Sequence, residues 1–62
     1  MFTTKEKLQC VVRELGFRHR VYARRVELGK MKQADAAHEI AVMEAIAEDY
    51  KQLAAAEEPQ LL

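Results

Sequence analysis

The chain has 62 residues, of which 50% are hydrophobic and 32% are charged, and its formal net charge is zero. This length allows one domain at most, and the single cysteine excludes an intrachain disulfide. No apolar run is long enough for a signal peptide or a membrane span, so we expect a cytoplasmic protein that does not contact membrane. Because so short a chain buries little apolar surface, self-association is the remaining way to stabilise it.

The charge is divided between the two halves of the chain. Residues 1–30 have eight lysines and arginines against three glutamates, a net charge of +5. Residues 31–62 have two lysines against seven carboxylates, a net charge of −5. Halves of opposite charge can attract each other within one hairpin or between two chains.

The first predicted element is a helix over about residues 4–28. Thr3 and Glu6 have the spacing of a capping box, in which each side chain binds the other residue's main-chain amide. Gly29 suits the left-handed position that follows many helices, so a turn over about residues 29–32 comes next. Gly16, inside the helix, costs about 1 kcal/mol relative to Ala and leaves room for a neighbouring helix.

The second predicted element is a helix over about residues 33–56. The segment is rich in alanine, which favours helix, and Asp35 in its first turn interacts well with the positive end of the helix dipole. Pro59 cannot continue the helix, so residues 57–62 are expected to form a frayed tail.

Each predicted helix has an apolar face with residues spaced alternately four and three apart. In the first helix the face consists of Leu8, Val12, Leu15, His19, Tyr22 and Val26, with Val11 beside it; in the second it consists of Ala36, Ile40, Met43, Ala47, Tyr50 and Ala54, widened by Val42, Ile46 and Leu53. If the second helix folds back, these residues meet in pairs whose numbers sum to 62, which centres the turn at Met31, close to Gly29. The sequence therefore predicts an all-α fold, an antiparallel two-helix hairpin forming one domain over residues 1–62.

A second apolar stripe on the first helix lies nearly opposite the first. It consists of Cys10, Phe17, Val21 and Leu28, which the second helix cannot cover. These could be scattered surface hydrophobes, which are common. A helix that is apolar on two sides is usually buried on two sides, however. We therefore expect the stripe at or near the seam of a homodimeric four-helix bundle.

Arginines on the same helix suggest a second kind of partner. Arg13, Arg20 and Arg24 share one side and could contact the phosphates of nucleic acid. The alternative is a solvated basic face that meets acidic groups of the second helix or of another subunit. Because the net charge is zero and no known DNA-binding motif occurs, we expect the alternative.

Glu39 is predicted near the middle of the second helix's apolar face, where a carboxylate needs a partner. Tyr22, Arg18 and Arg25 are within reach from the first helix, so we expect a structural polar link between the helices. A catalytic acid is the alternative, but no nucleophile or base accompanies Glu39. We accordingly expect no enzyme activity.

Two patterns around His38 resemble metal sites but are incomplete. His38-Glu39 would need a histidine at position 42, which is Val42. Asp35 and His38 have di-iron-like spacing, yet such a site needs several more ligands from neighbouring helices. We therefore expect neither a metal nor another cofactor, and we interpret His19 as a core histidine.

Three segments, Arg20-Val21-Tyr22, Gly29-Lys30-Met31 and residues 37–46, resemble small uncharacterised helical proteins encoded in bacteriophages and prophages. The resemblance covers most of residues 13–50 and brings no established activity. Those proteins often have proline where this chain has Ala23, and threonine or serine where it has Lys32. The departures predict a straighter first helix and a weaker N-cap on the second. The resemblance implies a phage-type accessory protein and leaves its target open.

Overall fold

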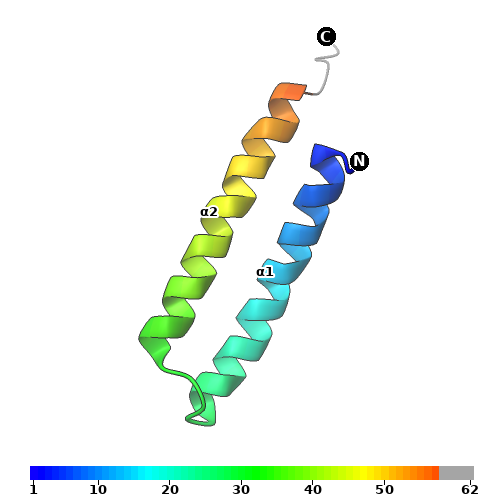
Figure 1. Ribbon diagram of the computed structural model, residues 1–62. Coiled ribbons are helices and arrows are strands. Elements are labelled where there is room, and N and C mark those ends of the chain that lie inside the picture. The colour runs from blue at the N-terminus through cyan, green and yellow to red at the C-terminus, as the bar shows by residue number, and fades with distance from the viewer. Residues whose placement is uncertain (58–62) are drawn as a thin grey trace.

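The structure, a computed structural model, describes residues 1–57. It consists of helix α1 (Thr4–Glu27) and helix α2 (Gln33–Glu57), joined by a short turn. The helices run antiparallel side by side, with the turn at one end and the N-terminus at the other (Figure 1). The predicted hairpin is confirmed, and α2 includes Glu57, the first residue of the expected tail. The rest of that tail lies outside the described residues.

The start of α1 has the predicted capping box. The amide of Glu6 donates to the hydroxyl of Thr3 at 3.1 Å, and the amide of Thr3 donates to the Glu6 carboxylate at 3.2 Å. These two bonds satisfy amides that have no partner inside the helix. At the start of α2, the main-chain carbonyl of Lys32 accepts from Ala36 at 3.0 Å.

The end of α1 is fixed by the turn around Gly29. Gly29 has a φ of 70°, in the left-handed region that favours glycine. The amide of Lys30 donates to the carbonyl of Arg25 at 2.8 Å, and the amide of Gly29 donates to the carbonyl of Val26 at 3.0 Å. This pair of bonds is a Schellman motif, which ends α1 and directs the chain into α2.

The face of α2 that contacts α1 is the predicted one. Ala36 and Ala47 are buried, and the other four members, Ile40, Met43, Tyr50 and Ala54, are half-buried. Of the three residues predicted to widen this face, Ile46 is half-buried, but Val42 and Leu53 are exposed, so the prediction is wrong for those two. Alanine at two positions of the seam allows the helix backbones to approach closely. At the open end, the Thr4 hydroxyl donates to the Glu57 carboxylate at 2.7 Å, which agrees with the predicted fold-back.

The face of α1 differs from the prediction at two positions. Val12 and His19 are exposed, whereas Val11 and Arg18 are half-buried with Leu8, Leu15 and Tyr22. The prediction of a core histidine at position 19 is therefore wrong. Arg18 can occupy the seam because its aliphatic stem packs there while its guanidinium reaches polar groups.

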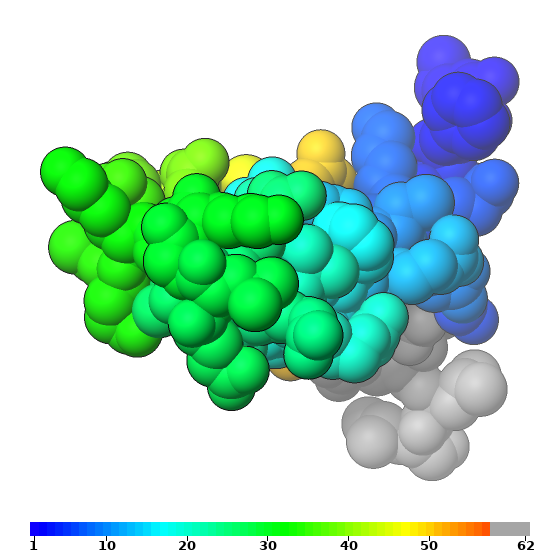
Figure 2. All heavy atoms as spheres, turned by 90° about the horizontal axis from the view of Figure 1, so that it is seen from below, coloured from blue at the N-terminus to red at the C-terminus, as the bar shows by residue number. Residues whose placement is uncertain are grey.

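The hairpin has almost no core of its own. Among residues 1–57, only Ala36 and Ala47 are buried. The molecule measures 50 × 21 × 18 Å and exposes 5202 Å², more than the about 4,100 Å² expected for a compact monomer of this mass. In the space-filling view from the loop end (Figure 2), the first residues, in dark blue, stand out from the rest. A single hairpin thus leaves much of its surface uncovered.

Candidate interaction surface

Arg18 forms the polar link between the helices. Its Nη1 donates to the main-chain carbonyl of Glu39 at 2.9 Å, and its Nε lies 3.2 Å from Oε1 of Glu14. The guanidinium carbons of Arg18 and Arg25 lie 5.8 and 5.9 Å from the centre of the Tyr22 ring, within cation–π range. Three of the four residues predicted to form the link are thus brought together.

The fourth residue, Glu39, does not act as predicted. Its side chain is exposed, and within residues 1–57 its carboxylate makes no hydrogen bond or ion pair. The expectation of a buried carboxylate is wrong, because α2 turns the Glu39 side chain toward solvent and only its carbonyl toward Arg18. The sequence pattern predicts which side chains share a helix face, but it does not indicate that the main-chain carbonyl of Glu39 would accept the hydrogen bond from Arg18.

The second apolar stripe of α1, which we call the outer stripe, consists of Cys10, Phe17, Val21 and Leu28. Phe17 and Leu28 are 46% and 55% exposed, Cys10 is exposed and Val21 is half-buried. Because the seam of α1 runs through Val11 and Arg18, the outer stripe lies roughly a third of a turn from the seam, not opposite it. Within this hairpin α2 leaves it open to solvent.

The three candidate nucleic-acid arginines border the outer stripe. Arg13, Arg20 and Arg24 are all exposed. Arg13 and Arg20 line a shallow groove of about 390 Å³ with Cys10, Glu14 and Phe17. The basic groups therefore do not form a surface of their own, since they alternate with apolar side chains and with a carboxylate.

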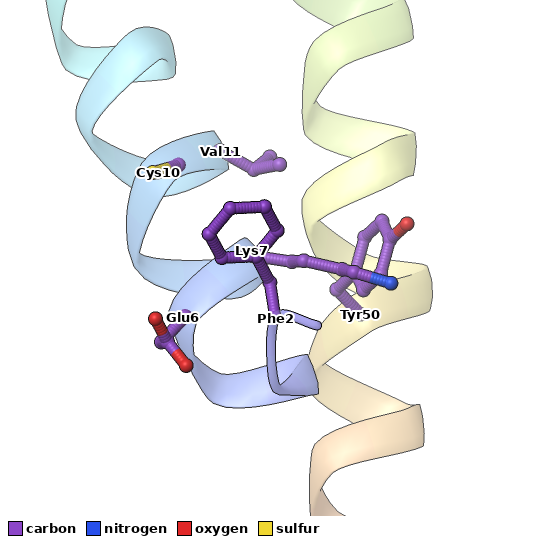
Figure 3. A pocket seen from close by; sticks show the side chains of 6 residues that line it. All are labelled: Phe2, Glu6, Lys7, Cys10, Val11 and Tyr50. Atoms are coloured by element: carbon purple, nitrogen blue, oxygen red, sulfur yellow. The ribbon is translucent and has the colours of Figure 1, made fainter.

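A second groove, of about 480 Å³, lies at the open end of the hairpin and is mostly apolar. It is lined by Phe2, Glu6, Lys7, Cys10, Val11 and Tyr50. In Figure 3, Val11 and Tyr50 extend from opposite helices toward the space between them. Sequence analysis missed Phe2, which is 72% exposed and precedes the helix. Its place just before the N-cap, where apolar residues often pack onto the first turns, was the available signal.

The side chains that could bind a metal ion or act as nucleophiles are dispersed over the described part of the chain. Within residues 1–57, no three His, Cys, Asp or Glu side chains gather closely enough to hold a metal ion. Both histidines and the Cys10 thiol are exposed. Over the same residues, neither helix is long and apolar enough to cross a membrane.

No family model matches this chain, and neither does any curated protein or solved structure. The resemblance to phage and prophage proteins therefore stays a prediction.

Proposed function

We propose that this chain is a non-enzymatic helical interaction module that self-associates through the outer stripe into a four-helix bundle. The observation that carries the proposal is the contrast between how little the hairpin buries, none of it on α1, and how much apolar surface the outer stripe leaves exposed. Only two alanines are buried in the described hairpin, while Phe17 and Leu28 remain about half exposed. Covering large apolar side chains with a second copy would supply the burial that one hairpin lacks.

The area of exposed surface supports self-association. The accessible area exceeds that expected of a compact monomer by about 1,100 Å². A stable protein interface covers about 800 Å² on each partner. One additional interface per hairpin would therefore cover most of an area of this size, and a dimer is the simplest assembly that provides it.

The experiment that tests this function is sedimentation equilibrium of the full chain over a wide concentration range. We expect a dimer whose dissociation on dilution is accompanied by loss of helical circular dichroism. A folded monomer at high micromolar concentration would contradict the proposal, because it would show that the hairpin needs no partner.

We further propose that the dimer acts in the cytoplasm as an accessory protein of the phage or prophage type, docking onto another protein. The resemblance over residues 13–50 supports this part of the proposal. Purification of the tagged chain from its native host, with a Phe17→Glu variant as control, tests it. A protein retained by the natural chain and lost with the variant is expected.

The alternative function is a small nucleic-acid-binding accessory protein that uses Arg13, Arg20 and Arg24. It is favoured by the exposure of all three arginines on one side of α1. It is opposed by the zero net charge and by the acidic α2 beside α1, because those carboxylates repel phosphate. The two functions make opposite predictions for Arg20.

A further inference from the structure

The outer stripe belongs to a longer seven-residue repeat. Positions alternately three and four apart run along this side of α1 as Lys7, Cys10, Glu14, Phe17, Val21, Arg24 and Leu28, and all of them are exposed or half-buried. Such spacing is typical of the contact line between two packed helices. Three of these residues are charged: Lys7 lies at the N-terminal end of the repeat, whereas Glu14 and Arg24 interrupt its apolar positions and constrain what can cover them.

We infer that the occupant of this surface is α1 of a second copy, packed antiparallel and centred at His19. In this register Cys10 faces Leu28, Phe17 faces Val21, and Glu14 faces Arg24 of the other copy, each pair summing to 38. Two-fold symmetry repeats every pair, so from Cys10 to Leu28 the apolar members meet apolar members, and Glu14 and Arg24 meet opposite charges. Lys7 is level with Met31, beyond the end of α1. The inference rests on the proposed self-association and adds its geometry.

The other pairings of α1 with itself are poorer. A parallel pairing sets Glu14 against Glu14 and Arg24 against Arg24 near the centre of the interface, which is repulsive. Sliding the antiparallel pairing by one repeat sets Phe17 against Glu14, or Val21 against Arg24. Both shifts place an apolar side chain opposite a charge, so one register is selected.

Charges flanking the repeat agree with the same register. Arg13 and Glu27 precede repeat positions by one residue, and in the antiparallel pair Arg13 lies beside Glu27 of the second copy. Arg20 lies next to the two-fold axis, beside Arg20 of the second copy. On this flank the two Arg13–Glu27 pairs, together with the two Glu14–Arg24 pairs of the repeat, offset the repulsion between the two Arg20 side chains.

The groove on the outer surface has the shape that this pairing needs. Cys10, Arg13, Glu14 and Phe17, four of its lining residues, form a hole of the kind that receives one side chain of a facing helix. The facing residue is Arg24 of the second copy, whose stem would cover Phe17. Oε1 of Glu14 is 3.2 Å from Arg18, and its Oε2 makes no hydrogen bond among residues 1–57. Oε2 is therefore free to accept a hydrogen bond from the guanidinium of Arg24 of the second copy.

Disulfide formation tests the orientation. In the antiparallel pair a thiol introduced by Leu28→Cys faces Cys10 of the other chain, so mild oxidation with glutathione disulfide should link most chains covalently. The natural chain should not link, since its two Cys10 thiols are about 27 Å apart, the length of eighteen helical residues. The double variant Cys10→Ser with Leu28→Cys should not link either, for the same reason.

Other results would overturn the inference in distinguishable ways. Linkage of the natural chain through Cys10 would show a parallel pair. Interchain linkage of Leu53→Cys, without linkage of Leu28→Cys, would show α1 packed on α2 of the other copy. In both cases sedimentation would still report a dimer, and the proposed function would survive. If sedimentation instead shows a folded monomer, the antiparallel pairing and the proposed function are both wrong.

Charge exchange gives a second readout that needs no oxidation. Glu14→Arg and Arg24→Glu should each raise the dimer dissociation constant about tenfold or more, and the double variant should return it to within about threefold of the natural value. In contrast, Arg20→Gln should lower the dissociation constant, because it removes the repulsion at the two-fold axis. Failure of the double variant to restore dimerisation would overturn the Glu14–Arg24 pairing.

Discussion

Arg18 on α1 donates a 2.9 Å hydrogen bond to the main-chain carbonyl of Glu39 on α2, and so joins the helices near the middle of the hairpin. The same guanidinium binds Glu14 and lies over Tyr22. One side chain therefore connects a carboxylate, an aromatic ring and the facing backbone. The acceptor is main chain, so no substitution at position 39 short of a backbone change removes it.

We expect Arg18→Ala to lower the free energy of unfolding by about 1–2 kcal/mol, because it removes a charge-assisted bond between the helices and the packing of the stem. Urea unfolding followed by circular dichroism, at a fixed protein concentration, measures the change. Arg25→Ala is the matched control: it removes a similar contact with Tyr22 without the bond to α2, and should cost about 0.5 kcal/mol. Equal losses in the two variants would show that the bond to Glu39 contributes nothing.

Glu39→Ala should change stability by less than about 0.5 kcal/mol, since exposed side chains without partners contribute little. The Arg18 bond persists because the Glu39 carbonyl is unchanged. The same unfolding experiment tests this. A loss of 1–3 kcal/mol, as expected for a buried and paired carboxylate, would instead support the interpretation from sequence.

The two glycines should respond to alanine in opposite directions. Gly29→Ala should destabilise the hairpin by about 1–2 kcal/mol, because Gly29 has a φ of 70° and L-residues are strained there. Gly16→Ala should stabilise it by about 0.5–1 kcal/mol, since Gly16 is helical and an added Cβ would meet only the Arg20 guanidinium at 3.9 Å. Thermal unfolding of both variants provides the comparison. A gain from Gly29→Ala would refute the role assigned to the turn.

Features encoded by local signals could be predicted from the sequence. The Thr3–Glu6 capping box and the Gly29 turn depend on residues within a few positions of each other. The centre of the α2 face was also predicted correctly, because its six members follow the four-and-three spacing of one helix side. Val42, Leu53 and Glu39, predicted on the same face, are exposed. These signals were sufficient for the element bounds and for the hairpin.

The face of α1 could not be placed by hydrophobicity alone. Val11 and Val12 are chemically equivalent, and the choice between them depends on whether His19 or Arg18 occupies the seam. Ranking residues by polarity favours histidine, yet arginine packs its stem and reaches a carbonyl on α2. That carbonyl is specified by the fold and not by the identity of residue 39.

Phe17→Glu should weaken dimerisation about a hundredfold, because a charge without a partner would enter the interface. Val12→Glu is a closely matched control: Val12 is 47% exposed and Phe17 is 46% exposed on the same helix, but Val12 lies off the outer stripe. We expect this variant to dimerise normally in sedimentation experiments. If both variants dissociate alike, the effect is one of charge on α1 in general, and the stripe loses its assigned role.

The arginines decide between the two candidate functions. If Arg13, Arg20 and Arg24 contact phosphates, affinity for nucleic acid must fall steeply with salt, and removal of each arginine must reduce the salt slope by about one unit. We expect instead no binding tighter than micromolar to duplex DNA or RNA at physiological salt. The α2 carboxylates repel phosphate, and Arg13 and Arg24 are expected to pair with glutamates of the second copy.

Fluorescence anisotropy with mixed-sequence DNA and RNA duplexes, titrated at several salt concentrations, measures this affinity. Arg20 makes the result decisive, because the two functions assign it opposite roles. In the self-associating module Arg20→Gln strengthens the dimer and leaves weak, unselective duplex binding almost unchanged. In a nucleic-acid-binding protein it weakens the complex and flattens its salt dependence. A nanomolar, salt-sensitive complex abolished by Arg20→Glu would replace the interaction module with the nucleic-acid alternative.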